Sequence, residues 1–243
     1  LTKLNLKLKK PLGNVYPLND NNFIISSYEG MHIYNRKKNA LKYFNDIRKI
    51  NELDNISYND GTISKNKLWI GLSHLKESKN LGYFGYLQNK NFVTIDKGFK
   101  VSNGPAIDEK KGYLYFSDSS KFCIYQYNLK NLKKKTLIKF KRNQGFPDGI
   151  TLDNKNGLWV AHWAGGQVSR INLNSKKIDF SIKIPALNVT SVTFVGKKLN
   201  HLFITTAKIE TSKNHLKNYK YSGSSFIIKT EYTGLKIPYY NMR

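Results

Sequence analysis

The chain has 243 residues, of which 40% are hydrophobic and 13% aromatic, and this is enough for a hydrophobic core within one domain. Its apolar runs are much shorter than the ~20 residues of a membrane-spanning helix, so we expect no membrane partner. The formal net charge of +25 favours an anionic partner such as nucleic acid, but the distribution of the charges argues against that class.

The lysines and arginines occur in small groups along the whole chain, and nearly all lie in polar segments between apolar runs. Solvated turns are expected at such positions. The chain is also rich in Asn, Ile and Tyr, a bias that is typical of a genome poor in G and C. We therefore attribute the charge to composition and expect no nucleic-acid partner.

A short polar motif recurs along the chain with a period of about 45 residues, which predicts a repeat architecture. The residues that mark it are Asn14, Asn59, Asn103 and Asp148, and Ser191 stands close to the next step. Repeats of this length are typical of blades, arrays or solenoids, and the residues that follow each marker distinguish among these.

An apolar, strand-like run follows each marker after a polar turn, and a second run follows the first. Aromatic and β-branched residues dominate these runs and alternate with polar residues, which is typical of β-strands. The first runs are Phe23–Ile25, Leu68–Leu72, Tyr113–Phe116, Leu158–Ala161 and Leu202–Ile204, and the second runs include Met31–Tyr34, Ile124–Tyr127, Val168–Ile171 and Phe226–Ile228. Residues 39–50 alone have an apolar spacing compatible with a short helix.

Several strands in each repeat of about 45 residues indicate a β-propeller, and the sequence contains five such units. Because the innermost strand of each blade lines the central channel, the Asn and Asp markers would point toward one place on the axis. The alternative is that these residues only cap turns, as Asn-Gly and Asp-Gly commonly do. Four markers in register favour the first interpretation.

Four segments resemble the senescence-marker-protein/gluconolactonase/luciferin-regenerating family, to which regucalcin belongs, in their order and their spacing. Each segment pairs a marker with the runs that follow it: Tyr58–Gly61 with Leu68–Gly71, Ser102–Gly104 with Gly112–Ser119, Phe146–Gly149 with Gly157–Ala161 and Gly165–Val168, and Thr190–Ser191 with Leu202–Ala207. The resemblance covers essentially the whole chain. It implies an all-β, six-bladed propeller, of which about five blades are present here, as a single domain over residues 1–243 that is N-terminally truncated relative to the family.

The resemblance also implies roles for four residues. Asn103 and Asp148 match two protein ligands of a divalent cation in the channel, and Asp148 also matches the general base. Asn59 matches a substrate-binding position, and Asp60 lies beside it in the same motif. We expect Ca²⁺ as the cation, with Zn²⁺, Mn²⁺ and Mg²⁺ as alternatives, because oxygen ligands suit hard cations.

Two departures from the family pattern bear on this site. Ser57 stands where some members carry an arginine, so a contact with the substrate is lost and substrate choice can differ. The family's glutamate ligand lies about one blade upstream of Gly13, and this chain begins too late to contain it. No residue of this sequence can be assigned that role.

The implied chemistry is metal-dependent opening of a sugar lactone to an aldonic acid, with a small-molecule lactone as the partner and a cytoplasmic location as the expectation. A cation can polarise the lactone carbonyl, and the Asp148 carboxylate can take a proton from the attacking water. No Gly-x-Ser-x-Gly motif is present, so no serine nucleophile is expected. Two alternatives stay open: a metal- or sugar-binding propeller without turnover, and a related propeller esterase or phosphotriesterase.

Three further polar residues are expected to be structural. Asp118 follows a strand-like run and predicts a turn, and His162 is expected to form a local hydrogen bond. The chain's single cysteine, Cys123, excludes an internal disulfide and lies in an alternating run that predicts a small core residue. No Cys/His cluster in the sequence has the spacing of a zinc site.

Overall fold

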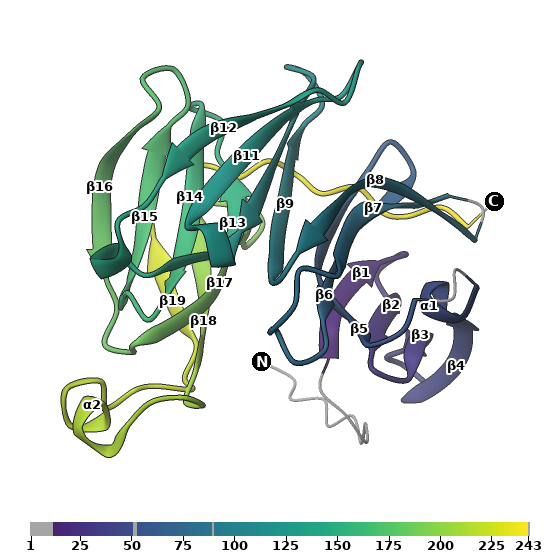
Figure 1. The fold of residues 1–243 in the computed structure, drawn as a ribbon, viewed down its shortest axis with the longest axis horizontal. Coiled ribbons are helices and arrows are strands. Elements are labelled where there is room, and N and C mark those ends of the chain that lie inside the picture. Colours follow the sequence, from purple (N-terminus) through teal and green to yellow (C-terminus); the bar gives the residue numbers. More distant parts are fainter. Residues whose placement is uncertain (1–11, 51–52, 89, 243) are drawn as a thin grey trace. The chain divides into compact units, whose positions relative to one another are not determined.

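The computed structural model describes residues 12–50, 53–88 and 90–242, and within them the chain is almost entirely β-structure. The chain divides into two compact units. Unit 1 comprises residues up to Ser102 together with residues 237–243, and unit 2 comprises residues 103–236. Figure 1 labels the strands of both units.

Unit 1 contains two four-stranded antiparallel sheets, in which the strands follow one another in sequence order. The first sheet is β1 (Leu12–Pro17), β2 (Asn22–Ser27), β3 (Gly30–Asn35) and β4 (Ala40–Asn45), and the second is β5 (Ile56–Ser64), β6 (Lys67–His74), β7 (Gly82–Gln88) and β8 (Asn91–Phe99). Helix α1 (Ile47–Ile50) lies between them in the sequence. The apolar residues of both sheets form one core, to which Tyr240 of the C-terminal segment contributes.

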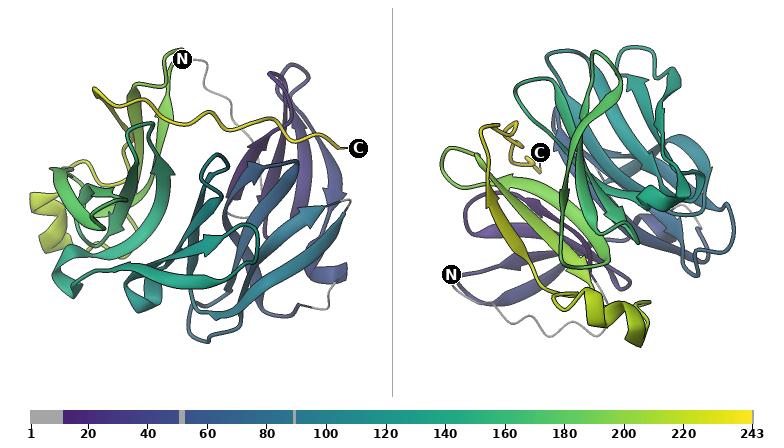
Figure 2. Two further views of the ribbon diagram at one scale, coloured as in Figure 1. Left: turned by 90° about the horizontal axis from the view of Figure 1, so that it is seen from above. Right: turned by 90° about the vertical axis from the view of Figure 1, so that its left-hand side faces the viewer.

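Unit 2 contains three more sheets of the same kind, and its first strand begins at Ser102, the last residue of the main part of unit 1. Two are four-stranded: β9 (Ser102–Asp108), β10 (Tyr113–Asp118), β11 (Cys123–Asn128) and β12 (Lys134–Lys139), then β13 (Phe146–Leu152), β14 (Gly157–Trp163), β15 (Gln167–Asn172) and β16 (Lys177–Lys183). The third has three described strands, β17 (Asn188–Val195), β18 (His201–Ala207) and β19 (Phe226–Lys229). Helix α2 (Lys213–Asn218) lies in the connection between β18 and β19, where both views in Figure 2 show it at the edge of the unit.

The predicted strand-like runs correspond to the second and third strands of the five sheets. All five first runs lie in second strands, β2, β6, β10, β14 and β18, and the second runs lie in β3, β11, β15 and β19. The second strands β2, β6, β10 and β14 are mostly buried and β18 is partly buried, whereas the fourth strands such as β4 and β16 are largely exposed. This burial explains why the second strands read as nearly continuous apolar runs.

Five consecutive antiparallel sheets of three or four strands confirm the all-β class and the β-propeller, with five blades in the described part of the chain. The six-bladed type and the single domain over residues 1–243 stay predictions. The helical interpretation of residues 39–50 was largely wrong: residues 40–45 form β4, the fourth strand of the first sheet, and only residues 47–50 form a helix. Neither α1 nor α2, the helices of the described residues, has the length that a bilayer crossing requires.

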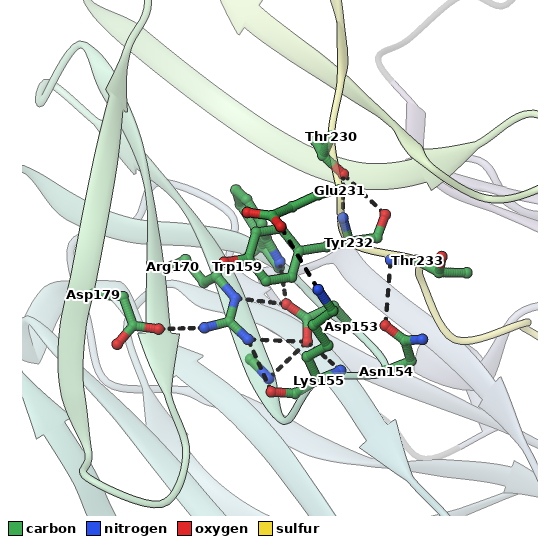
Figure 3. Close-up of polar contacts among 11 residues, drawn as sticks. Asp153, Asn154, Lys155, Trp159, Arg170, Asp179, Thr230, Glu231, Tyr232 and Thr233 are labelled. Atoms are coloured by element: carbon green, nitrogen blue, oxygen red, sulfur yellow. Dashed lines mark hydrogen bonds and ion pairs between the residues drawn. The ribbon is translucent and has the colours of Figure 1, made fainter.

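A buried cluster of charged side chains joins the sheet β13–β16 to residues 230–234 (Figure 3). The Asp153 carboxylate accepts hydrogen bonds from Trp159 Nε1 at 2.8 Å and Arg170 Nε at 2.7 Å. Arg170 also pairs with Asp179, and its guanidinium lies 4.4 Å from the centre of the Tyr232 ring. Asp153 and Arg170 are both about 3% exposed, so this ion pair is fully inside the protein.

Candidate functional site

The marker residues all lie in the first strand of a sheet, and four of the five first strands are irregular at that point. The pairing with the second strand shifts by one residue between Leu12 and Val15, between Tyr58 and Gly61, between Pro147 and Ile150, and between Val189 and Ser191. A β-bulge of this kind redirects a side chain out of the regular alternation and is common beside active sites. Asn14, Asn59 and Asp148 therefore lie within bulges, and all five markers lie within strands, so the alternative that they only cap turns was wrong.

The glycine after a marker allows a neighbouring first strand to approach closely. A methyl group on Gly149 would lie 2.4 Å from Ser191 Oγ and 2.9 Å from Ser191 Cα. A methyl group on Gly61 would lie 2.2 Å from the hydroxyl oxygen of Tyr16. These distances are shorter than real carbon contacts, so only glycine fits at these two positions.

In unit 1, hydrogen bonds hold the bulge that carries Asn59 and Asp60. Asn59 donates from Nδ2 to the carbonyl oxygen of Ser102 at 2.7 Å, which turns its Oδ1 to the other side of the amide. Asp60 Oδ1 accepts from Gly61 N at 2.8 Å and from Asn14 Nδ2 at 3.2 Å. Both residues are half-buried, and their positions are fixed by the neighbouring strands.

Tyr16 lies in the core beside this bulge. Its side chain is 1% exposed, and burial, together with the negative charge of Asp60, raises the pKa of its hydroxyl far above the ordinary value. Tyr16 is thus a neutral, buried group beside the bulge at Gly61.

In unit 2, Asn103 and Asp148 lie on the first strands β9 and β13, and the hydroxyl groups of Ser117, in β10, and Ser119, directly after β10, lie between these strands. Asn103 is 7% exposed and donates from Nδ2 to Ser119 Oγ at 2.9 Å. Ser119 Oγ donates to the carbonyl oxygen of Pro147, directly before Asp148, at 2.6 Å. Ser117 Oγ donates to the carbonyl oxygen of Asp148 itself at 3.0 Å.

The structure therefore brings the four predicted site residues together in pairs. Asn59 and Asp60 share one bulge in unit 1, and Asn103 and Asp148 lie on strands of unit 2 that Ser119 links. A single site that contains both pairs stays a prediction. Ser57 is half-buried and donates to the carbonyl oxygen of Ser73 at 3.5 Å.

The oxygen donors of the second pair suit a hard divalent cation. Asn103 and Asp148 contribute an amide oxygen and a carboxylate, the ligand types that Ca²⁺ and Mg²⁺ prefer. Within residues 12–50, 53–88 and 90–242, no three His, Cys, Asp or Glu side chains form a cluster that could hold a metal ion on its own.

Three residues have the structural roles that the sequence predicts. Asp118 caps the 3-10 helix η1 (Ser119–Lys121) and accepts from Ser120 Oγ at 2.9 Å. Cys123 is 2% exposed, and burial raises the pKa of its thiol. His162 is fully buried on β14, where Nε2 hydrogen-bonds Ser169 Oγ and the ring meets Phe140 edge-on with 5.0 Å between centroids.

The stability of the protein is expected to fall as the pH drops from about 6.5 to about 4, because of His162. Burial, and secondarily the charge of Lys183, lower the pKa of this imidazole from 6.5 to about 4, so the folded state excludes the proton that the unfolded state binds. This contribution is complete above pH 6.5 and decreases through the window by an amount on the order of 3 kcal/mol. Urea unfolding at pH 7.0, 6.0 and 5.0 measures it.

The matched variants for this experiment are His162→Gln, which keeps a donor near Ser169, and His215→Gln at an exposed position of α2. His162→Gln should flatten the pH dependence between 7 and 5, and His215→Gln should leave it unchanged. An equal pH dependence in the wild type and His162→Gln would show that other groups cause the effect.

The two serines at the end of β10 and directly after it are functional candidates that sequence reasoning missed. Ser117 and Ser119 belong to the segment Gly112–Ser119, which was assigned to a strand and a turn only. One signal does exist, since second strands of other sheets also end in a buried hydroxyl: Ser26 hydrogen-bonds Asn14, and Ser73 hydrogen-bonds Ser102. A serine at this place in three of the five sheets indicates support for the marker strands.

Comparisons with known proteins agree with this geometry. A family model described as "SMP-30/Gluconolactonase/LRE-like region" matches residues 2–208. A Sulfolobus acidocaldarius protein is 35% identical over 62% of this chain and 57% of its own length. The 6-deoxy-6-sulfogluconolactonase of Pseudomonas putida is 27% identical over 74% of this chain and 64% of its own length. The chain thus spans less than two thirds of either relative.

Among solved structures, a calcium-binding protein, regucalcin, from Agrobacterium tumefaciens superimposes with a TM-score of 0.88. The match covers 96% of this chain and 81% of that protein at 19% sequence identity, so it establishes the similarity of fold.

Proposed function

This chain belongs to the SMP-30/gluconolactonase/LRE-like family, and we propose on that premise that it hydrolyses the ring ester of a sugar lactone to the aldonic acid. The observation that carries the proposal is the link between Asn103 and the Asp148 bulge through Ser119. The name of the Pseudomonas putida relative, a sulfogluconolactonase, supports the substrate class.

We propose that Asn103 and Asp148 hold a divalent cation, and the calcium-binding protein from Agrobacterium tumefaciens supports Ca²⁺ over Zn²⁺, Mn²⁺ or Mg²⁺. When bound, such a cation would polarise the lactone carbonyl and stabilise the negative charge that develops on its oxygen. The residues supply oxygen ligands of the type that this ion prefers.

Asp148 is proposed as the general base. Its half-buried carboxylate takes a proton from the water that attacks the carbonyl carbon, and the new C–O bond forms as the carbonyl becomes tetrahedral. The bond from that carbon to the ring oxygen then breaks, and the same proton passes from Asp148 to the ring oxygen. Asn59 and Asp60 can accept hydrogen bonds from sugar hydroxyls, which would orient the ring.

The test is acid release from gluconolactone, xylonolactone and related sugar lactones by the purified protein, with and without EDTA. We expect hydrolysis above the spontaneous rate and its loss with the chelator. Restoration by added Ca²⁺ is the control, because it separates removal of the cation from damage by EDTA.

A second candidate is a propeller that binds the cation without turnover, and Ser57 at the position of the family arginine favours it. Cation binding without hydrolysis of any lactone would support this function and contradict the first. Hydrolysis of aryl esters or phosphotriesters but of no lactone would instead assign another ester class.

A further inference from the structure

We propose that Ser119 is a positioning residue that determines which atom of the Asn103 amide faces the cation. The inference rests on the proposed function, since it concerns the same metal site. Ser119 is 6% exposed and lies between Asn103 on β9 and Pro147 on β13.

The hydrogen-bond inventory of the three groups fixes the orientation. A serine hydroxyl has one proton, and the Pro147 carbonyl oxygen can only accept, so Ser119 donates its proton there at 2.6 Å. Toward Asn103 the same oxygen can therefore act only as an acceptor. The amide of Asn103 must then present Nδ2 to Ser119, at 2.9 Å, and Oδ1 to the opposite side.

This orientation decides whether Asn103 can be a ligand. An amide has an oxygen that binds cations and an NH₂ group that does not, and rotation of the amide by half a turn exchanges them. Ser119 makes the rotated amide unfavourable, because two lone-pair-bearing oxygens would then face each other in a buried place.

The same hydroxyl also constrains the Asp148 bulge. Pro147 directly precedes Asp148, so the bond from Ser119 fixes the strand at the point where the bulge begins. Asp118 in turn holds Ser119 in place, because its carboxylate caps the 3-10 turn that Ser119 opens. One side chain thus orients one proposed ligand and anchors the strand of the other.

The experiment measures the affinity for Ca²⁺ by calorimetry in the wild type, in Ser119→Ala and in Ser120→Ala, with a thermal melt of each to confirm folding. Outer groups that orient metal ligands typically affect affinity by 10- to 100-fold. We therefore expect Ser119→Ala to weaken Ca²⁺ binding by about 10- to 100-fold. Ser120→Ala is the control, because the Ser120 hydroxyl lies in the same turn but hydrogen-bonds Asp118 and not Asn103. This variant should bind Ca²⁺ as the wild type does.

A second comparison separates orientation from general damage to the site. In an Asn103→Ala background there is no amide to orient, so loss of the Ser119 hydroxyl should change the remaining Ca²⁺ affinity less than threefold or so. The same loss in both backgrounds, or wild-type affinity in Ser119→Ala, would overturn the inference. If the wild type binds neither Ca²⁺ nor Mg²⁺, Mn²⁺ or Zn²⁺, the proposed metal site fails and the inference fails with it.

Discussion

Replacement of Asp148 by asparagine is expected to reduce lactone hydrolysis by about 10²- to 10⁴-fold, the usual contribution of a general base. The amide cannot accept the proton of the attacking water. The fold should persist, because the bond that anchors this bulge runs from Ser117 Oγ to the backbone oxygen of residue 148 and not to its side chain. The measurements are kcat and KM for the best lactone substrate, with a thermal melt of the variant.

Asp148→Ala distinguishes the two roles proposed for this carboxylate. Asparagine keeps an oxygen that can bind a cation, whereas alanine removes the ligand and the base together, so only alanine should also strongly raise the cation requirement. Asp108→Asn is the matched control, since that carboxylate lies at the end of β9 and accepts from the backbone of Lys111. Turnover within threefold or so of the wild type in both Asp148 variants would remove this residue from the mechanism.

The sequence predicted the architecture because the blades bury different strands to different degrees. Leu68–Leu72 and Leu158–Ala161 are recognisable as strands since β6 and β14 are covered on both faces. The recurrence of Asn or Asp one strand earlier marked the first strand of four of the five sheets. The repeat period and the apolar pattern can be read along the chain, so one sequence suffices to detect them.

The supports of the site could not be predicted in the same way. The bulges at Asn59 and Asp148 follow from pairing between strands, and no local sequence signal specifies a one-residue shift in that pairing. The contact of Ser119 with Asn103 and Pro147 joins residues from three strands or turns. Which of many serines lies between two marker strands depends on tertiary packing.

The same limit applies to the buried cluster around Asp153. Asp153 begins a polar segment that resembles an ordinary turn in the sequence. Its partner Arg170 lies on β15, and Tyr232, which packs on Arg170, lies in the segment after β19. Charged residues are rarely buried unless they are paired, and a single sequence does not reveal the pair.

Asp153→Ala is expected to lower the free energy of unfolding by about 3–5 kcal/mol, the largest stability effect that we predict, because it leaves the buried Arg170 guanidinium with only the partly exposed Asp179 as a charged partner. The Arg170 side chain is 4% exposed, and the lost carboxylate also accepted from Trp159 Nε1 and the backbone of Gly157. Urea unfolding followed by circular dichroism measures the change. If Asp153→Ala does not fold, Asp153→Asn, which keeps one acceptor oxygen and the volume, should show a smaller loss.

The matched control for this prediction is the neighbouring pair of Lys155 and Glu231. Their charged atoms lie 3.7 Å apart, but the side chains are 55% and 75% exposed, so water screens the attraction. Glu231→Gln should therefore cost less than about 1 kcal/mol. A similar small cost for Asp153→Ala would show that water or neighbouring groups solvate Arg170 once the Asp153 carboxylate is removed. A large difference between the two pairs would instead establish burial as the reason that the Asp153 cluster stabilises the sheet β13–β16 and its attached segment.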